Sequence, residues 1–81
     1  MEQLLRARRR AVGARQTTRA LQKGQVKVVY LARDAEKHVT GPIAELCRDN
    51  RVEVIWVEQM RELGKVCGID VDCAAAAVLQ E

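Results

Sequence analysis

Hydrophobic positions along the chain change repeatedly between helical spacing and the near-continuous runs of buried strands. The stretch 26–32 is β-branched and almost wholly apolar, which is typical of a strand covered on both faces. Between such runs, apolar residues recur at three- and four-residue spacing, as on one side of an amphipathic helix. The pattern predicts helices at 1–8, 14–23, 40–50 and 60–68, and strands at 9–12, 26–32, 52–57 and 73–79.

The predicted elements alternate between helix and strand from one end of the chain to the other. This alternation indicates helices on both faces of a sheet. We expect an α/β fold, a three-layer α/β/α sandwich with a small mixed four-stranded sheet, and a single domain over residues 1–81. The stretch 73–79 is mostly alanine. We interpret it as a strand whose small side chains admit close packing of helices, although its periodicity fits a helix as well.

Local signals refine three of these elements. Leu4 and Leu5 are expected to point inward from the first helix. The triplet Thr40-Gly41-Pro42 predicts the start of a helix, because proline is tolerated in a first turn. Residues 69–72, which carry two aspartates, are expected to form a loop before the last strand.

The net charge of +3 conceals an uneven distribution. Residues 1–23 hold seven basic side chains and one acidic side chain, a net charge of +6, whereas residues 24–81 hold seven basic and ten acidic side chains, a net charge of −3. We expect a positive field at one end of the molecule, which suits a polyanion. A solvated basic helix face would give the same run of charge. Only two aromatic residues are present, which argues against modules that stack bases on aromatic rings.

Residues suited to catalysis or metal binding are sparse. The chain has no serine, so a Ser-His-Asp arrangement is excluded. Cys47, Cys67 and Cys73 form no CxxC pair, and His38 lies at no zinc-ligand spacing from them. Their apolar neighbours favour buried thiols in a reducing compartment. A cysteine enzyme would need one exposed thiol of low pKa. We therefore expect that the protein is not an enzyme, and we expect neither a metal nor a cofactor.

Gly13 follows a predicted strand and precedes a predicted helix. Because glycine has no Cβ, the backbone of another molecule can approach closely there. The first N–H groups of the helix point outward, with the positive end of the helix dipole behind them. This combination predicts a local anion site, although a plain strand-to-helix turn would also explain the glycine.

Basic and amide side chains surround this turn. Arg15, Gln16, Arg19 and Lys23 share one broad polar face of the predicted helix. Arginine reads a guanine edge and glutamine an adenine edge with two hydrogen bonds each. Phosphate contacts are expected from Lys23 and from the preceding pair, Arg9-Arg10. The arrangement fits a nucleic acid better than a small anion.

Three stretches of the chain, GARQTTRALQKG, VKVVYLARDA and LGKVCGIDVDCAAAAVL, closely resemble the ribosomal protein L7Ae/L30e superfamily of kink-turn RNA-binding proteins, in particular its short bacterial members. The resemblance runs from about residue 5 to residue 79. In that family a Gly-x-Asn-Glu-x-x-Lys pattern opens the second helix and contacts the tandem sheared G·A pairs of a kink-turn, a sharply bent RNA helix. Gly13 matches the glycine, while Arg15, Gln16 and Arg19 stand where the family commonly has Asn, Glu and Lys.

The resemblance implies a second contact in the loop before the last strand, where apolar residues of the family cover the extruded nucleotides of the bulge. Ile69, Asp70 and Val71 match this loop. The two apolar residues could equally be anchors of the last strand. The complete implied RNA-binding set is Arg9, Arg10, Gly13, Ala14, Arg15, Gln16, Arg19, Lys23, Ile69, Asp70 and Val71.

The function implied by the resemblance is recognition and stabilisation of kink-turn RNA, in ribosomal RNA or a regulatory messenger RNA. The large ribosomal subunit is one implied partner. The N-terminus is charged and no apolar run approaches membrane-spanning length, so we expect a cytoplasmic protein with no membrane partner. We also expect a monomer. The alternative is a protein-interaction or scaffold module whose basic end docks on an acidic partner.

Overall fold

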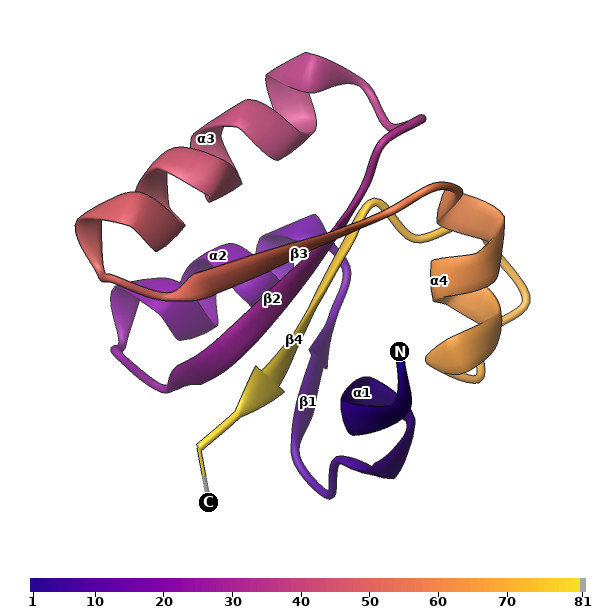
Figure 1. Cartoon of the computed structure of the whole chain (residues 1–81), viewed down its shortest axis with the longest axis horizontal. Helices are drawn as coiled ribbons and strands as arrows, with labels where there is room; N and C mark the ends of the chain where they lie inside the picture. Colours follow the sequence, from indigo (N-terminus) through magenta and orange to yellow (C-terminus); the bar gives the residue numbers. More distant parts are fainter. Residues whose placement is uncertain (81) are drawn as a thin grey trace.

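The computed structural model describes residues 1–80, in which four helices and four strands alternate along the chain (Figure 1). In chain order they are α1 (Glu2–Arg6), β1 (Arg10–Val12), α2 (Ala14–Gln22), β2 (Val26–Ala32), α3 (Lys37–Asp49), β3 (Glu53–Val57), α4 (Met60–Val66) and β4 (Ala75–Leu79). The predicted order of elements is confirmed. None of the helices in this part of the chain is long and apolar enough to cross a membrane.

The strands form one mixed sheet in the order β1-β4-β2-β3. Strand β4 pairs antiparallel with both β1 and β2, whereas β2 and β3 are parallel. The alanine run therefore lies at the centre of the sheet, and residues 75–77 have no exposed surface. Side chains of one methyl group leave room for helices to pack close to both faces, which confirms the interpretation of this run as a strand.

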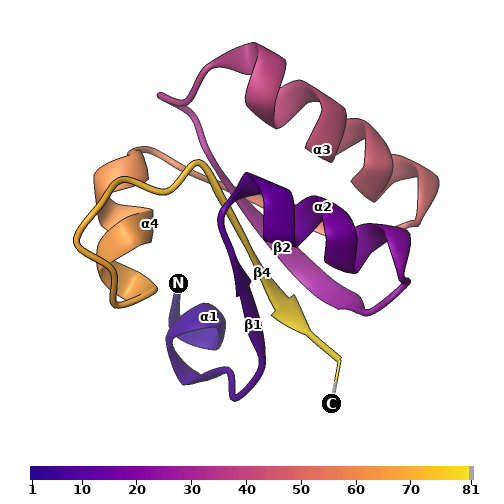
Figure 2. The same cartoon turned by 180° about the vertical axis from the view of Figure 1, so that it is seen from behind.

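Two hydrophobic clusters lie on opposite faces of the sheet and define the layers. One cluster packs Leu4 of α1 and Leu63 of α4 against β2 and β4. The other packs Leu21 of α2 and Ile43 of α3 against the opposite face. Figures 1 and 2 show α1 and α4 on one side of the sheet and α2 and α3 on the other. The predicted three-layer α/β/α arrangement is confirmed.

Two local predictions were wrong. Leu5 points outward and is 62% exposed, because a five-residue helix presents one position, Leu4, squarely to the sheet. Helix α3 begins at Lys37, three residues before the predicted start, so that Pro42 lies inside the helix. Pro42 is exposed. The carbonyl of His38, which loses its partner to this proline, is in the exposed first turn, where water can bond to it.

The two ends of the sheet carry different segments. At one end, which we call the Gly13 edge, the N–H of Gly13 donates to the carbonyl oxygen of Ala75 (2.8 Å). At the other end, the Arg9 edge, the N–H of Leu79 donates to the carbonyl oxygen of Arg9 (3.0 Å). Strand β1 joins the two edges, so four residues of extended chain separate Arg9 from Gly13, about 13 Å.

Candidate nucleic-acid interface

Gly13 forms the turn between β1 and α2 at the Gly13 edge. Its backbone has φ +95° and ψ 159°, a combination that residues with a side chain rarely adopt. The hydrogen bond from Gly13 to Ala75 holds this turn against the first residue of β4. A Cβ built on Gly13 would meet no atom of residues 1–80 within 4 Å. The Cα of Gly13 therefore faces open space, where another molecule can approach the backbone closely.

Helix α2 begins directly after this turn with unpaired N–H groups. The first hydrogen bond of the helix is donated by the N–H of Thr17 to the carbonyl oxygen of Gly13 (3.0 Å), so the three N–H groups before Thr17 have no partner within the helix. Gly13 offers no side-chain cap, and the first turn holds no acidic residue. The partial positive charge at this end of α2 is left free to attract an anion.

Gln16 is held across the opening of α2. Its Oε1 accepts a hydrogen bond from the N–H of Val12 (3.1 Å), which fixes the side-chain amide beside the Gly13 turn. The amide nitrogen remains as a donor, and the oxygen keeps a second lone pair. Gln16 is thus oriented before any ligand binds. This resembles the reach-back of a capping box, in which a side chain at the third helical position satisfies a backbone N–H before the helix.

Arg15 and Arg19 lie along one side of a groove between α2 and α3. The groove has a volume of about 440 Å³, and His38 and Pro42 of α3 lie on its other side. Both arginines are exposed, and no carboxylate in residues 1–80 forms a salt bridge with either of them. Their guanidinium groups are therefore available to bind a ligand next to the first turn of α2. Ala14, the first residue of α2, also lines this groove.

The other predicted basic residues lie elsewhere. Arg9 is at the opposite edge, where its guanidinium donates to the carbonyl oxygen of Gln80 (3.1 Å). Lys23 caps the far end of α2, about 13 Å along the helix from its start. Arg10 is half-buried on the α1/α4 face and donates to the carbonyl oxygen of Val66 (3.3 Å), the last residue of α4. The expectation of one positive end was wrong, because β1 carries these charges across the length of the sheet.

The loop of residues 69–72 leads toward β4, whose first residue, Ala75, is bonded to Gly13 at the Gly13 edge. Val71 is 68% exposed and Asp70 is exposed, whereas Ile69 is half-buried and packs against the core cluster of α1 and α4. The structure thus separates the two apolar residues: Ile69 anchors the loop, and Val71 is free to contact a ligand. Four residues join Val71 to Ala75, the partner of Gly13, so the two segments lie within about 14 Å.

Gly64 was missed by the sequence reasoning. It is buried in α4, and a Cβ there would collide with the carbonyl oxygen of Val71. The glycine lets the backbone of the loop lie directly on the helix. The sequence signal was a glycine inside a helical pattern, which often marks close packing.

The three cysteines are free and buried, as predicted. Burial raises the pKa of Cys47 and of Cys67 to about 11, so both thiols are protonated at neutral pH and are poor nucleophiles. The Sγ of Cys73 donates to the carbonyl oxygen of Ala75 (3.0 Å), the same oxygen that accepts from Gly13. Within residues 1–80, no three His, Cys, Asp or Glu side chains gather in a group that could hold a metal ion.

Comparison with known proteins gives the family. The model of the ribosomal protein L7Ae/L30e/S12e/Gadd45 family matches residues 1–81. The chain belongs to this family. A protein of Caldanaerobacter subterraneus named as an RNA-binding protein is 45% identical over 69 residues, covering 85% of this chain and 84% of the relative. The RNA-binding protein YbxF of Geobacillus stearothermophilus is 35% identical over 79 residues, covering 98% and 96%.

A solved structure of low sequence identity has the same fold as this chain. The 15.5kD RNA binding protein of Giardia lamblia superposes on this chain with a TM-score of 0.83 at 22% sequence identity. The match covers 95% of this chain and 63% of the other, so the chain spans less than two thirds of that protein. The mixed four-stranded α/β sandwich is thus the fold of this L7Ae-family member.

Proposed function

We propose that this L7Ae-family protein binds RNA and recognises a kink-turn through the first turn of α2 and the loop before β4. The observation that carries the proposal is the outward-facing, uncapped turn at Gly13. It is flanked by the side chains of Arg15 and Arg19, which form no salt bridge within residues 1–80. Relatives named as RNA-binding proteins support RNA as the class of ligand. Ribosomal RNA and regulatory messenger RNA are the target classes that we propose.

In this proposal, the start of α2 enters the groove of the bent RNA at its sheared G·A pairs. The missing Cβ of Gly13 allows the RNA to reach the free N–H groups of α2. Gln16, already oriented by Val12, offers an amide donor to a base edge. Arg19 offers a planar guanidinium, which binds two acceptors of one guanine at once.

The exposed Val71 has a separate part in the proposal. Nucleotides extruded from a bulge lose their stacking, and an apolar protein surface can cover their faces. Val71 supplies such a surface without an aromatic ring, and Gly64 holds its backbone in place. The loop and the α2 turn would then contact neighbouring parts of one kinked RNA.

The mechanism that we propose is a shift of population. An RNA that exchanges between extended and kinked forms is driven to the kinked form only by the difference between the protein's affinities for the two. To move the RNA from 1% to 99% kinked, the protein must bind the kinked form about 10⁴-fold more tightly. Contacts that exist only in the kinked form, at the G·A pairs and at the extruded nucleotides, are the source of this difference.

The test compares a fluorescently labelled kink-turn RNA with the same RNA whose G·A pairs are replaced by Watson–Crick pairs. We expect clearly tighter binding of the kink-turn RNA. The variant Arg19→Gln should reduce this preference by about 1–3 kcal/mol, the usual contribution of one bidentate base contact.

Arg61→Gln is the matched control for this test, because Arg61 is also an exposed helical arginine, but on α4. The control should keep the wild-type preference for the kink-turn. Equal affinity of the wild-type protein for both RNAs would overturn the proposed kink-turn recognition. An equal loss of preference in both variants would remove Arg19 from the base-reading role.

A further inference from the structure

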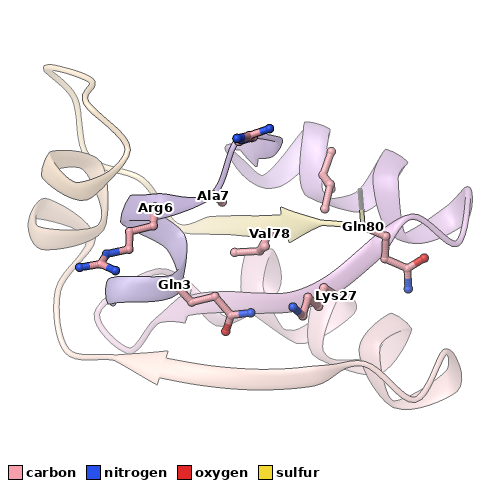
Figure 3. A pocket seen from close by; sticks show the side chains of 8 residues that line it. Gln3, Arg6, Ala7, Lys27, Val78 and Gln80 are labelled. Carbon is pink, nitrogen blue, oxygen red and sulfur yellow. The ribbon is translucent and has the colours of Figure 1, made fainter.

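A second basic cavity opens at the Arg9 edge, opposite the start of α2. It has a volume of about 590 Å³, larger than the groove between α2 and α3. Basic side chains come from three separate segments: Arg6 from α1, Arg8 from the segment before β1, and Lys27 from β2. We call this cavity the Lys27 pocket. Figure 3 shows Lys27 between Gln3 and Gln80, and Val78 of β4 also lines the pocket.

Within residues 1–80, the charge of the Lys27 pocket is largely uncompensated. None of the lining residues in this part of the chain is acidic. Arg6 pairs with Glu2 (3.3 Å), both on the exposed side of α1. Arg8 and Lys27 form no salt bridge with any carboxylate in residues 1–80. Two free positive charges therefore face the cavity, and Arg9 adds a third nearby, where it is bonded to the carbonyl oxygen of Gln80.

The position of Lys27 depends on an irregularity in β2. In a regular strand, residues two apart share a face. Here Val26 packs in the cluster under α2 and α3, whereas Val28 packs in the cluster under α1 and α4. The pairing of β2 with β4 shifts register between these two valines, with Lys27 as the extra residue. A bulge of this kind re-aims a side chain, and here it sets the one exposed residue of β2 into the pocket.

The chemistry of the Lys27 pocket fits phosphate groups of a duplex. Its lining has no aromatic side chain, so it offers no platform on which single-stranded bases could stack. Duplex RNA is instead bound through phosphates and 2′-hydroxyl groups. Arg8 and Lys27 can contact phosphates, and the amides of Gln3 and Gln80 can both donate to and accept from hydroxyl groups.

We propose that the Lys27 pocket binds the backbone of a double-stranded RNA segment other than the one held at Gly13. The protein then bridges two RNA segments, one at each end of the sheet. The two sites are separated by the length of β1, about 13 Å, within a molecule measuring 28 × 28 × 17 Å. This inference rests on RNA binding as proposed above, but it does not depend on kink-turn recognition.

The test measures binding of a labelled 12-base-pair RNA duplex without a kink-turn, first to the free protein and then to protein saturated with an unlabelled, short-armed kink-turn RNA. We expect the duplex to bind in both cases. In the double variant Arg8→Gln/Lys27→Gln, duplex binding should weaken, and its dependence on salt, as the slope of log K against log salt, should fall by about two, one for each lost phosphate contact.

The matched control is the double variant Lys37→Gln/Arg48→Gln, which removes two exposed charges from α3 on the opposite face of the sheet. It should bind the duplex as the wild type does. The charge-preserving variant Arg8→Lys/Lys27→Arg should retain binding. Thermal unfolding of each variant checks that these surface changes leave the fold intact.

Unchanged duplex binding in Arg8→Gln/Lys27→Gln would overturn the proposal, as would exclusion of the duplex by the bound kink-turn RNA. Binding of a labelled polyglutamate peptide at this pocket, with no binding of the duplex, would assign it to an acidic protein partner and overturn it as well. If duplex binding depends on Arg8 and Lys27 but the protein shows no preference for the kink-turn RNA, the Lys27 pocket is supported and the function proposed for Gly13 is refuted.

Discussion

The substitution Gly13→Ala tests two roles of this glycine separately. Its backbone conformation affects stability, whereas the open space around its Cα affects binding. At φ +95° and ψ 159° an alanine is strained, at a cost of about 1–3 kcal/mol. The added methyl group meets no atom within 4 Å, so no steric clash adds to this cost. For a domain of this size, each kcal/mol lowers the Tm by about 4–8 °C. We expect a folded but less stable protein.

The same methyl group should interfere with binding. It stands on the outward face of the turn, where we propose that RNA approaches the free N–H groups of α2. Kink-turn affinity should fall even when it is measured, by fluorescence, at a temperature where the variant is fully folded, because lower stability does not reduce binding there. Thermal unfolding followed by circular dichroism gives the stability of the same sample.

Gly24→Ala is the matched control for Gly13→Ala. Gly24 also has a positive φ (+69°) and also has open space around it, but it follows the other end of α2. This variant should lose stability and keep the kink-turn preference. An unchanged Tm for Gly13→Ala would refute the strained turn. Equal losses of affinity in the two variants would refute the proposal that blocked access at Gly13 weakens binding.

Three further predictions concern buried residues. Gly64→Ala should push the loop off α4 through its collision with the carbonyl of Val71, weakening kink-turn binding more than duplex binding; a wild-type affinity ratio would contradict this. Thr17→Val should raise the free energy of unfolding by about 1 kcal/mol, since the buried Thr17 hydroxyl has no hydrogen-bond partner within residues 1–80. A lower free energy of unfolding in urea would refute this prediction. Burial raises the pKa of Cys47 and Cys67 from 9.0 to about 11. The free energy of unfolding should therefore be constant below pH 9 and fall between pH 9 and 11, by up to about 1.4 kcal/mol per pH unit for each thiol. The same decline in a Cys47→Ala variant would argue against this cause.

Much of the fold could be predicted because the hydrophobic pattern and the glycine signals agreed. The strand at 26–32 was evident from its apolar β-branched run, and Gly13 marked the turn into α2. The start of α3 could not be read in the same way. Pro42 is a signal for a first turn, but here it lies one turn further into α3, on the exposed side. The hydrogen bond that it removes is the one to the carbonyl of His38, which lies in the exposed first turn, where water can bond to it.

The positions of the basic side chains in the fold could not be predicted from the sequence. Arg9, Arg10 and Arg15 are neighbours in the chain, yet an extended strand moves about 3.3 Å per residue and alternates its side chains between faces. Three residues of β1 are enough to send Arg9 to one edge of the sheet, Arg10 to the end of α4 and Arg15 to the other edge. Proximity in sequence therefore indicated one basic patch where the fold makes two.

The carbonyl oxygen of Ala75 links the two halves of the proposed RNA site. It accepts from the N–H of Gly13 (2.8 Å) and from the Sγ of Cys73 (3.0 Å), so the α2 turn and the end of the loop are tied to one atom of the central strand. Gly64 fixes the middle of the same loop on α4. Ordering of loops is a major cost of association. Because the turn and the loop are already held in place, a ligand that contacts both the turn and Val71 orders little of the protein when it binds. The small residues of this region, which carry no recognition chemistry themselves, thereby set the spacing at which Arg19 and Val71 can contact one RNA.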